Sequence, residues 1–145
     1  SGVIKNIDII DKKIGRHKVN RKKMSVSESG KESITKINIL RRYEKASSLE
    51  VELVTGRTHQ IRVHLAHIGH PIIGDKLYGF KKSVFTRHGD ILSLLESSEN
   101  IALHAASLEF KHPLSKDTFT INSKKPKYFT NLESLIEENS YANTN

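Results

Sequence analysis

Residues 49–71 read LEVELVTGRTHQIRVHLAHIGHP, and within this stretch a strand pattern gives way to a helix pattern. In its first six residues apolar side chains alternate with other residues, so that Leu49, Val51 and Leu53 share one face. This period of two is typical of a half-buried strand. Gly56 follows, and its backbone freedom suits a sharp turn after the strand.

The second half of the stretch predicts a helix. Thr58 is a suitable N-cap, and the helix should run to about residue 68. Gly69 then ends it, with Pro71 just beyond. The residues of its buried face recur at i, i+4 and i+7, and they are Ile61, Leu65 and Ile68.

Two arginines, Arg57 and Arg62, lie near the expected start of this helix. Positive charge there opposes the helix dipole and costs about 0.3–1 kcal/mol per charge. The conflict therefore suggests a compensating anion, and helix-start amides with arginine forks suit a carboxylate or a phosphate. The alternative is that both arginines lie in solvent or pair with nearby glutamates.

Alternating apolar residues predict two β-hairpins. The first joins residues 33–43 to 48–55, and the second joins residues 102–110 to 118–121. Residues 3–10 are apolar and β-branched, which favours extended structure. The side chains expected to share one face of a strand are Thr35, Ile37 and Ile39 in the first hairpin, and Ala106, Leu108 and Phe110 in the second.

Two further helices are expected, a short one near residues 91–95 and a closing one after a capping box at 130–133. Residues 81–89 are expected to form a mobile insertion, and residues 139–145 a frayed tail. The predicted class is α+β, a mixed and mainly antiparallel sheet with flanking helices. The closing helix should bury Leu132, Leu135 and Ile136.

The composition points to a polyanionic partner. The 145 residues carry 24 basic and 16 acidic side chains, a formal charge of +8. Cysteine is absent, which excludes disulfides and thiolate metal sites and fits a cytoplasmic protein. No apolar run reaches the length of about 18 residues expected of a membrane span.

A basic segment covers residues 12–23 and ends in Arg21, Lys22 and Lys23. It is either a solvated loop or a contact for RNA phosphates, which would provide affinity without sequence choice.

Two other groups of residues could form sites. His64, His67 and His70 recur near the helix end, but no acidic ligand lies nearby, so a metal site is not expected. Asp75 could be a nucleophile or base, although beside Gly74 it better suits the closing of a turn.

The stretch 56–62, GRTHQIR, resembles the third signature region of the RluA family of RNA pseudouridine synthases. The resemblance continues through residues 69–79, and weaker similarity occurs at 20–35 and 103–113, in the same order as in the family. It implies a catalytic domain that isomerises uridine by detaching uracil from C1′, rotating it and rejoining it through C5. No metal or organic cofactor would be needed.

The resemblance also implies roles for individual residues. Arg62 would pair with the nucleophilic aspartate of the family, and Leu65 would be the apolar wall against uracil. Arg57, His59 and Gln60 would bind substrate. The expected partner is RNA, in particular large-subunit ribosomal RNA, bound by a monomer with no membrane contact.

One departure from the family is large. Its nucleophile lies in a His-Arg-Leu-Asp motif, and none of the aspartates here follows such a string. We therefore expect residues 1–145 to be the C-terminal portion of a catalytic domain, inactive alone. The alternatives are a non-catalytic basic platform for RNA, or an enzyme of another class that uses Asp75 with the histidines.

Overall fold

An antiparallel hairpin organises the computed structural model, which describes residues 1–5 and 7–142. Strand β4 (Ile34–Arg42) pairs with β5 (Ser47–Leu53), with Ile37 opposite Val51. Strand β1 (Ile9–Asp11) adds to the other edge of β4, so the sheet order is β1-β4-β5. The predicted first hairpin is confirmed, and its buried face includes Thr35 and Ile37 as expected.

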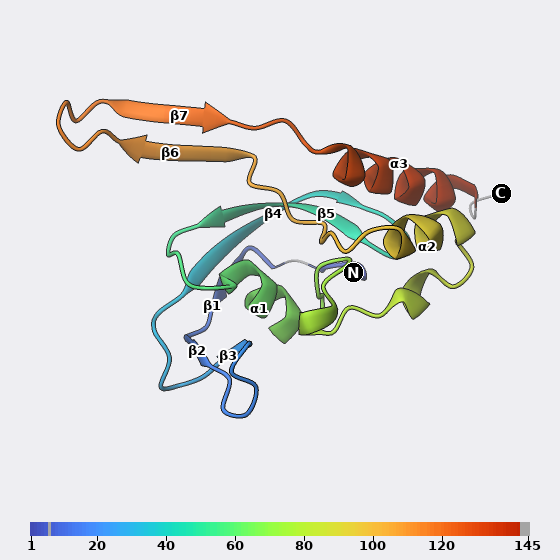
Figure 1. Ribbon diagram of the computed structural model, residues 1–145, viewed down its shortest axis with the longest axis horizontal. Coiled ribbons are helices and arrows are strands. Elements are labelled where there is room, and N and C mark those ends of the chain that lie inside the picture. The colour runs from blue at the N-terminus through green and yellow to red at the C-terminus, as the bar shows by residue number, and fades with distance from the viewer. Residues whose placement is uncertain (6, 143–145) are drawn as a thin grey trace.

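Two smaller hairpins flank this sheet. Strands β2 (Ile14–Arg16) and β3 (Met24–Val26) form one, and β6 (Ser107–Lys111) and β7 (Thr118–Asn122) form the other. The second projects away from the rest of the molecule (Figure 1). All strand pairings in the described part of the chain are antiparallel, but they form three sheets instead of one. The α+β class is confirmed.

The helices are α1 (Gln60–His67), α2 (Gly89–Glu96) and α3 (Lys127–Ala142), with short 3-10 turns η1 (Lys76–Tyr78) and η2 (Lys82–Phe85). Helix α1 packs on the central sheet, because Leu65 joins a buried cluster with Ile10 and Ile37. A second cluster lies between α2, α3 and η2 and includes the buried side chains Phe85, Ile91, Leu95, Leu132 and Ile136. The predicted helix near 91–95 and the apolar face of the closing helix are confirmed.

The predicted N-cap of α1 is wrong. The helix begins at Gln60, and its N-cap is His59, which has a left-handed backbone and makes no capping hydrogen bond through its side chain. The turn is closed instead by the Gln60 side chain, whose Oε1 accepts from the Arg57 amide at 3.0 Å. The Gln60 side chain therefore fixes the turn before α1 and does not take over the capping role expected of Thr58.

The capping box at Thr130 is also wrong, because α3 begins at Lys127 and Thr130 lies inside it. Pro126 precedes the helix, and its fixed φ angle suits a helix start. At the other end α3 continues through residue 142, where a frayed tail was expected, and residues 143–145 lie outside the described part.

Residues 81–89 are not the mobile insertion that was expected. They contain η2, which buries Phe85 to 1% exposure in the second cluster. Burial of one such side chain contributes about 1.5–3 kcal/mol, enough to hold a short turn in place. No helix in the described residues has both the length and the apolar character to cross a membrane.

Candidate active site

The first turn of α1 carries an arginine that is held by a buried carboxylate. Arg62 Nε donates to Asp75 Oδ2 at 2.8 Å, and Arg62 Nη2 donates to Asp75 Oδ1 at 2.9 Å. The Arg62 side chain is 18% exposed and that of Asp75 only 1%. The hydrogen bonds to Asp75 raise the pKa of Arg62. The expectation of an anion beside this arginine is met within the chain, by a residue 13 positions away.

Asp75 is placed by a turn that only glycine can precede. Gly74 has φ +86°, and a Cβ there would lie 2.3 Å from the Asn100 carbonyl oxygen. Asp75 Oδ1 also accepts from the Tyr78 amide at 3.2 Å, which caps η1. The predicted role of Asp75 in closing a turn is confirmed, and its bonds to Arg62 are a second role that was not expected from the sequence.

Tyr78 connects the arginine to two other elements. Its ring centroid lies 4.8 Å from Arg62 Cζ, a cation–π arrangement. Its hydroxyl accepts from the Met24 amide at 3.0 Å and lies 2.8 Å from His59 Nδ1. Lys23 Nζ lies 6.0 Å from the same ring. Tyr78 is not among the site residues expected from the sequence, where its one signal is its place three residues after Asp75 in the stretch 69–79.

His59 adopts an uncommon backbone at the edge of this site. Its φ is 57°, in the left-handed region, which costs a non-glycine residue of order 1 kcal/mol or more. Burial lowers the pKa of His59, and the nearby charge of Arg62 lowers it further. Both effects favour the neutral imidazole, whose Nδ1 lies within hydrogen-bonding distance of the Tyr78 hydroxyl.

Gln60 and Arg57 are used in different ways. Gln60 is buried, and its Nε2 donates to the Ile34 carbonyl and to Thr35 Oγ1, each at 3.0 Å. It therefore shapes the junction between strand and helix from inside. Arg57 is exposed and donates from Nε to the Glu32 carbonyl at 3.1 Å.

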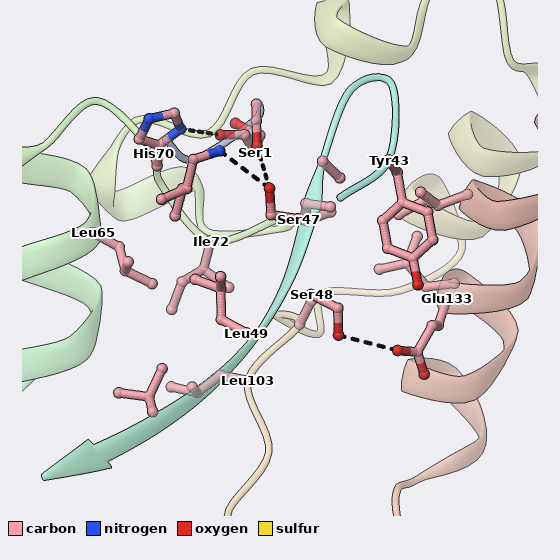
Figure 2. A pocket seen from close by; sticks show the side chains of 18 of the residues that line it. Ser1, Tyr43, Ser47, Ser48, Leu49, Leu65, His70, Ile72, Leu103 and Glu133 are labelled. Carbon is pink, nitrogen blue, oxygen red and sulfur yellow. Dashed lines mark hydrogen bonds between the residues drawn. The ribbon is translucent and has the colours of Figure 1, made fainter. Parts of the chain in front are cut away.

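Leu65 faces an apolar cavity instead of the cluster formed by Arg62, Asp75, Tyr78 and His59 (the arginine cluster). The cavity has a volume of about 110 Å³ and lies beside β5, between α1 and α3 (Figure 2). Leu49, Ile72 and Leu103 line it with Leu65, whereas Arg62 does not. Leu65 and Arg62 therefore face different surroundings on α1, and the roles that the resemblance implies for them, toward uracil and toward the aspartate, stay predictions.

The basic segment, residues 12–23, lies beside the arginine cluster through its last residue, Lys23. Arg21 and Lys22 occupy an exposed turn between β2 and β3, whereas Lys23 is half-buried near Tyr78. His17 organises the turn by accepting from the Asn20 amide at 3.1 Å. Of the three predicted RNA contacts, the structure brings Lys23 to the candidate site and leaves the other two in solvent.

His64 is engaged in the core. Its Nδ1 lies 2.8 Å from Thr35 Oγ1, and its Nε2 lies 2.9 Å from the Lys12 carbonyl. His70 Nδ1 lies 3.0 Å from the Ser1 carbonyl. Within residues 1–5 and 7–142, no three acidic or histidine side chains are grouped to hold a metal ion.

Comparison with known proteins agrees with the resemblance. Residues 2–67 match a family model described as RNA pseudouridylate synthase. The chain is 43% identical over 141 residues to an uncharacterized RNA pseudouridine synthase of Aquifex aeolicus. The match covers 95% of this chain and 43% of that protein. The chain is 38% identical to ribosomal large subunit pseudouridine synthase D of Pseudomonas aeruginosa, with 94% of this chain and 43% of that protein covered.

Solved structures show the same fold. Human RNA pseudouridylate synthase domain containing 1 superposes with a TM-score of 0.69 at 26% identity, over 92% of this chain and 54% of that one. Human RNA pseudouridylate synthase domain containing 4 has a TM-score of 0.62 at 22% identity. The chain spans less than half the length of the two curated relatives named above. Within the family, the resemblance predicts that the chain is most similar to ribosomal large subunit pseudouridine synthase C. This finer assignment stays a prediction, because the Pseudomonas aeruginosa relative is a synthase D.

Proposed function

Because the chain belongs to the RNA pseudouridine synthase family, we propose that it provides the arginine-bearing part of a site that isomerises uridine to pseudouridine. The proposed substrate is large-subunit ribosomal RNA, the RNA named for relatives of this chain. The observation that carries the proposal is the guanidinium of Arg62 in the first turn of α1. The buried carboxylate of Asp75 holds it through hydrogen bonds of 2.8 and 2.9 Å.

In this proposal the nucleophile is a residue other than Asp75. A uridine isomerase of this family attacks covalently through an aspartate, and the only carboxylate bonded to Arg62 among the described residues is that of Asp75. Asp75 is 1% exposed, and both its oxygens already accept hydrogen bonds, so it is unsuited to attack. We place the attacking aspartate in a longer protein, outside residues 1–145.

The RNA-binding part of the proposal rests on charge. The chain carries a formal charge of +8, and the exposed turn with Arg21 and Lys22 extends the positive surface beyond Lys23. Phosphate contacts of this kind provide salt-sensitive affinity and leave selection of the uridine to RNA shape. The proposal includes a monomer and a cytoplasmic location, the latter supported by the absence of cysteine.

A pseudouridine assay on ribosomal RNA transcripts tests the proposal with three proteins: this chain, the longer protein that contains it, and that protein with Arg62→Lys. We expect turnover by the longer protein alone. Lysine keeps the charge but loses the planar fork that fixes a carboxylate, and loss of that orientation should lower the rate on the order of 10²-fold. Turnover by this chain alone would contradict the placement of the nucleophile, and a fully active lysine variant would remove Arg62 from the site.

A non-catalytic RNA platform is the second candidate. It is favoured by one observation, that the charge of Arg62 is already neutralised by Asp75 within the chain. The same assay separates the two candidates, since a platform predicts RNA binding by the longer protein with no pseudouridine formed.

A further inference from the structure

We propose that Asp75 is a positioning residue, which fixes the guanidinium of Arg62 so that its second edge faces a further carboxylate. The inference rests on the proposed function, because that carboxylate is the attacking aspartate. It assigns Asp75 neither attack nor proton transfer.

Arg62 has more hydrogen-bond donors than Asp75 accepts. A guanidinium has five N–H groups in a fixed plane, and Asp75 takes two of them, one from Nε and one from Nη2. Among the described residues no further acceptor bonds to Arg62. No buried side-chain nitrogen in that part of the chain lacks a partner, so Nη1 reaches solvent. Nη1 and the remaining Nη2 hydrogen form an open second edge, which suits a two-bond contact with another carboxylate.

Asp75 itself is held by several backbone hydrogen bonds. Its backbone carbonyl accepts from the amides of Tyr78 and Phe80 at 3.2 and 3.0 Å, and its own amide donates to the Ile72 carbonyl at 3.1 Å. The close approach of Gly74 to Asn100 fixes the preceding peptide. A carboxylate held in this way can set the direction of a partner with a flexible side chain.

Two groups together define the orientation of Arg62. The Tyr78 ring lies 4.8 Å from Arg62 Cζ and limits tilting of the guanidinium plane. The two bonds to Asp75 prevent rotation within that plane. Tyr78 is itself held through its hydroxyl by Met24 and His59. The direction of the open edge is therefore set before a second carboxylate arrives.

The charges predict a specific pH effect. Asp75 and Arg62 together are neutral, so an arriving carboxylate interacts with a positive edge and with a nearby negative charge. A nearby like charge raises the pKa of a carboxyl group. Replacement of Asp75 by asparagine removes that charge, and the pKa of the attacking carboxyl should then fall. Activity that needs the ionised form should persist to lower pH, although orientation is lost.

The kinetic test uses the longer protein with Asp75→Asn. We expect kcat to fall on the order of 10²-fold, KM to change much less, and the acidic limb of the kcat profile to move to lower pH. The matched control is Glu133→Gln, which removes the ion pair with Lys125 (2.7 Å) away from the site and should leave kcat and the pH profile unchanged. A purely structural role for Asp75 predicts a lower melting temperature with an unshifted pH profile, and that result would overturn the proposal.

A second measurement needs no catalysis. In this chain, side-chain NMR of Arg62 should show slow rotation about the Nε–Cζ bond, and Asp75→Asn should make it fast while Glu133→Gln does not. Equally slow rotation in the asparagine variant would refute the positioning role. If the longer unmodified protein makes no pseudouridine, the proposed function fails, and this NMR comparison still decides the role of Asp75.

Discussion

At the scale of single residues, the backbone around the site decides where its side chains point. Left-handed φ angles occur at His59, directly before α1, and at Gly74, directly before Asp75. Gly56, where the sharp turn was expected, has a φ outside the left-handed region and an open Cβ position. The left-handed positions of this site are therefore the residues next to the helix start and next to the buried carboxylate, and Gly56 is not one of them.

This difference predicts opposite effects for two glycine-to-alanine changes in this chain. Gly74→Ala combines a left-handed φ with a Cβ 2.3 Å from a carbonyl oxygen, and should destabilise the fold by at least about 2 kcal/mol. Gly56→Ala meets no atom within 4 Å and should be neutral or stabilise by roughly 0.4–1 kcal/mol through the unfolded state. Urea unfolding of both variants measures this, and equal stabilities would contradict the structure around Gly74.

At the scale of elements, the β6–β7 hairpin differs from the rest of the fold because its apolar face is uncovered. Leu108 lies opposite Ile121, and Phe110 lies opposite Phe119, so all four share one face. Their exposures range from 41% to 60%. A two-stranded ribbon is marginal in water without a packed face, so this element contributes little to the stability of the chain.

Two phenylalanines test that conclusion. Phe119→Ala removes a ring that is 47% exposed and stacks on Phe110 at 5.8 Å, and should cost no more than about 1 kcal/mol. Phe85→Ala empties a core position that is 1% exposed and should cost about 3–5 kcal/mol. Thermal unfolding compares them, and a large loss for Phe119→Ala would show that the hairpin packs on something in solution.

At the scale of the whole molecule, the net charge and the position of individual basic residues have different consequences for RNA binding. The formal charge of +8 attracts any polyanion, whereas the basic hairpin β2–β3 is the one that brings Lys23 beside the arginine cluster. Local contact and overall charge therefore make different predictions for RNA binding.

Replacement of Arg21, Lys22 and Lys23 by alanine should weaken binding to structured RNA and reduce the slope of log affinity against log salt by roughly 0.7–0.9 for each lost phosphate contact. The matched control replaces three exposed lysines elsewhere, Lys111, Lys116 and Lys124, which lowers the net charge equally. Titrations at several salt concentrations measure both. Equal losses in the two variants would mean that only overall charge matters and that the hairpin is a solvated loop.

The sequence alone determined the elements whose signals are local. The alternation of apolar residues predicted β4, β5 and β7, and the helical spacing predicted α1 and the buried face of α3, because each pattern repeats within one element. Helix starts were predicted less well. At α1 the turn is closed by the Gln60 side chain, whose role depends on which backbone amide it meets, and α3 begins directly after Pro126, three residues before the expected capping box.

Tertiary structure decided the candidate site. Arg62 was identified from its sequence context, but its carboxylate partner lies 13 residues later, beyond the end of the helix, and reaches it only because Gly74 permits the turn against Asn100. Tyr78 enters through contacts with Met24, 54 residues before it. Such contacts depend on how separate elements pack, and packing leaves no periodic signal in the amino-acid sequence.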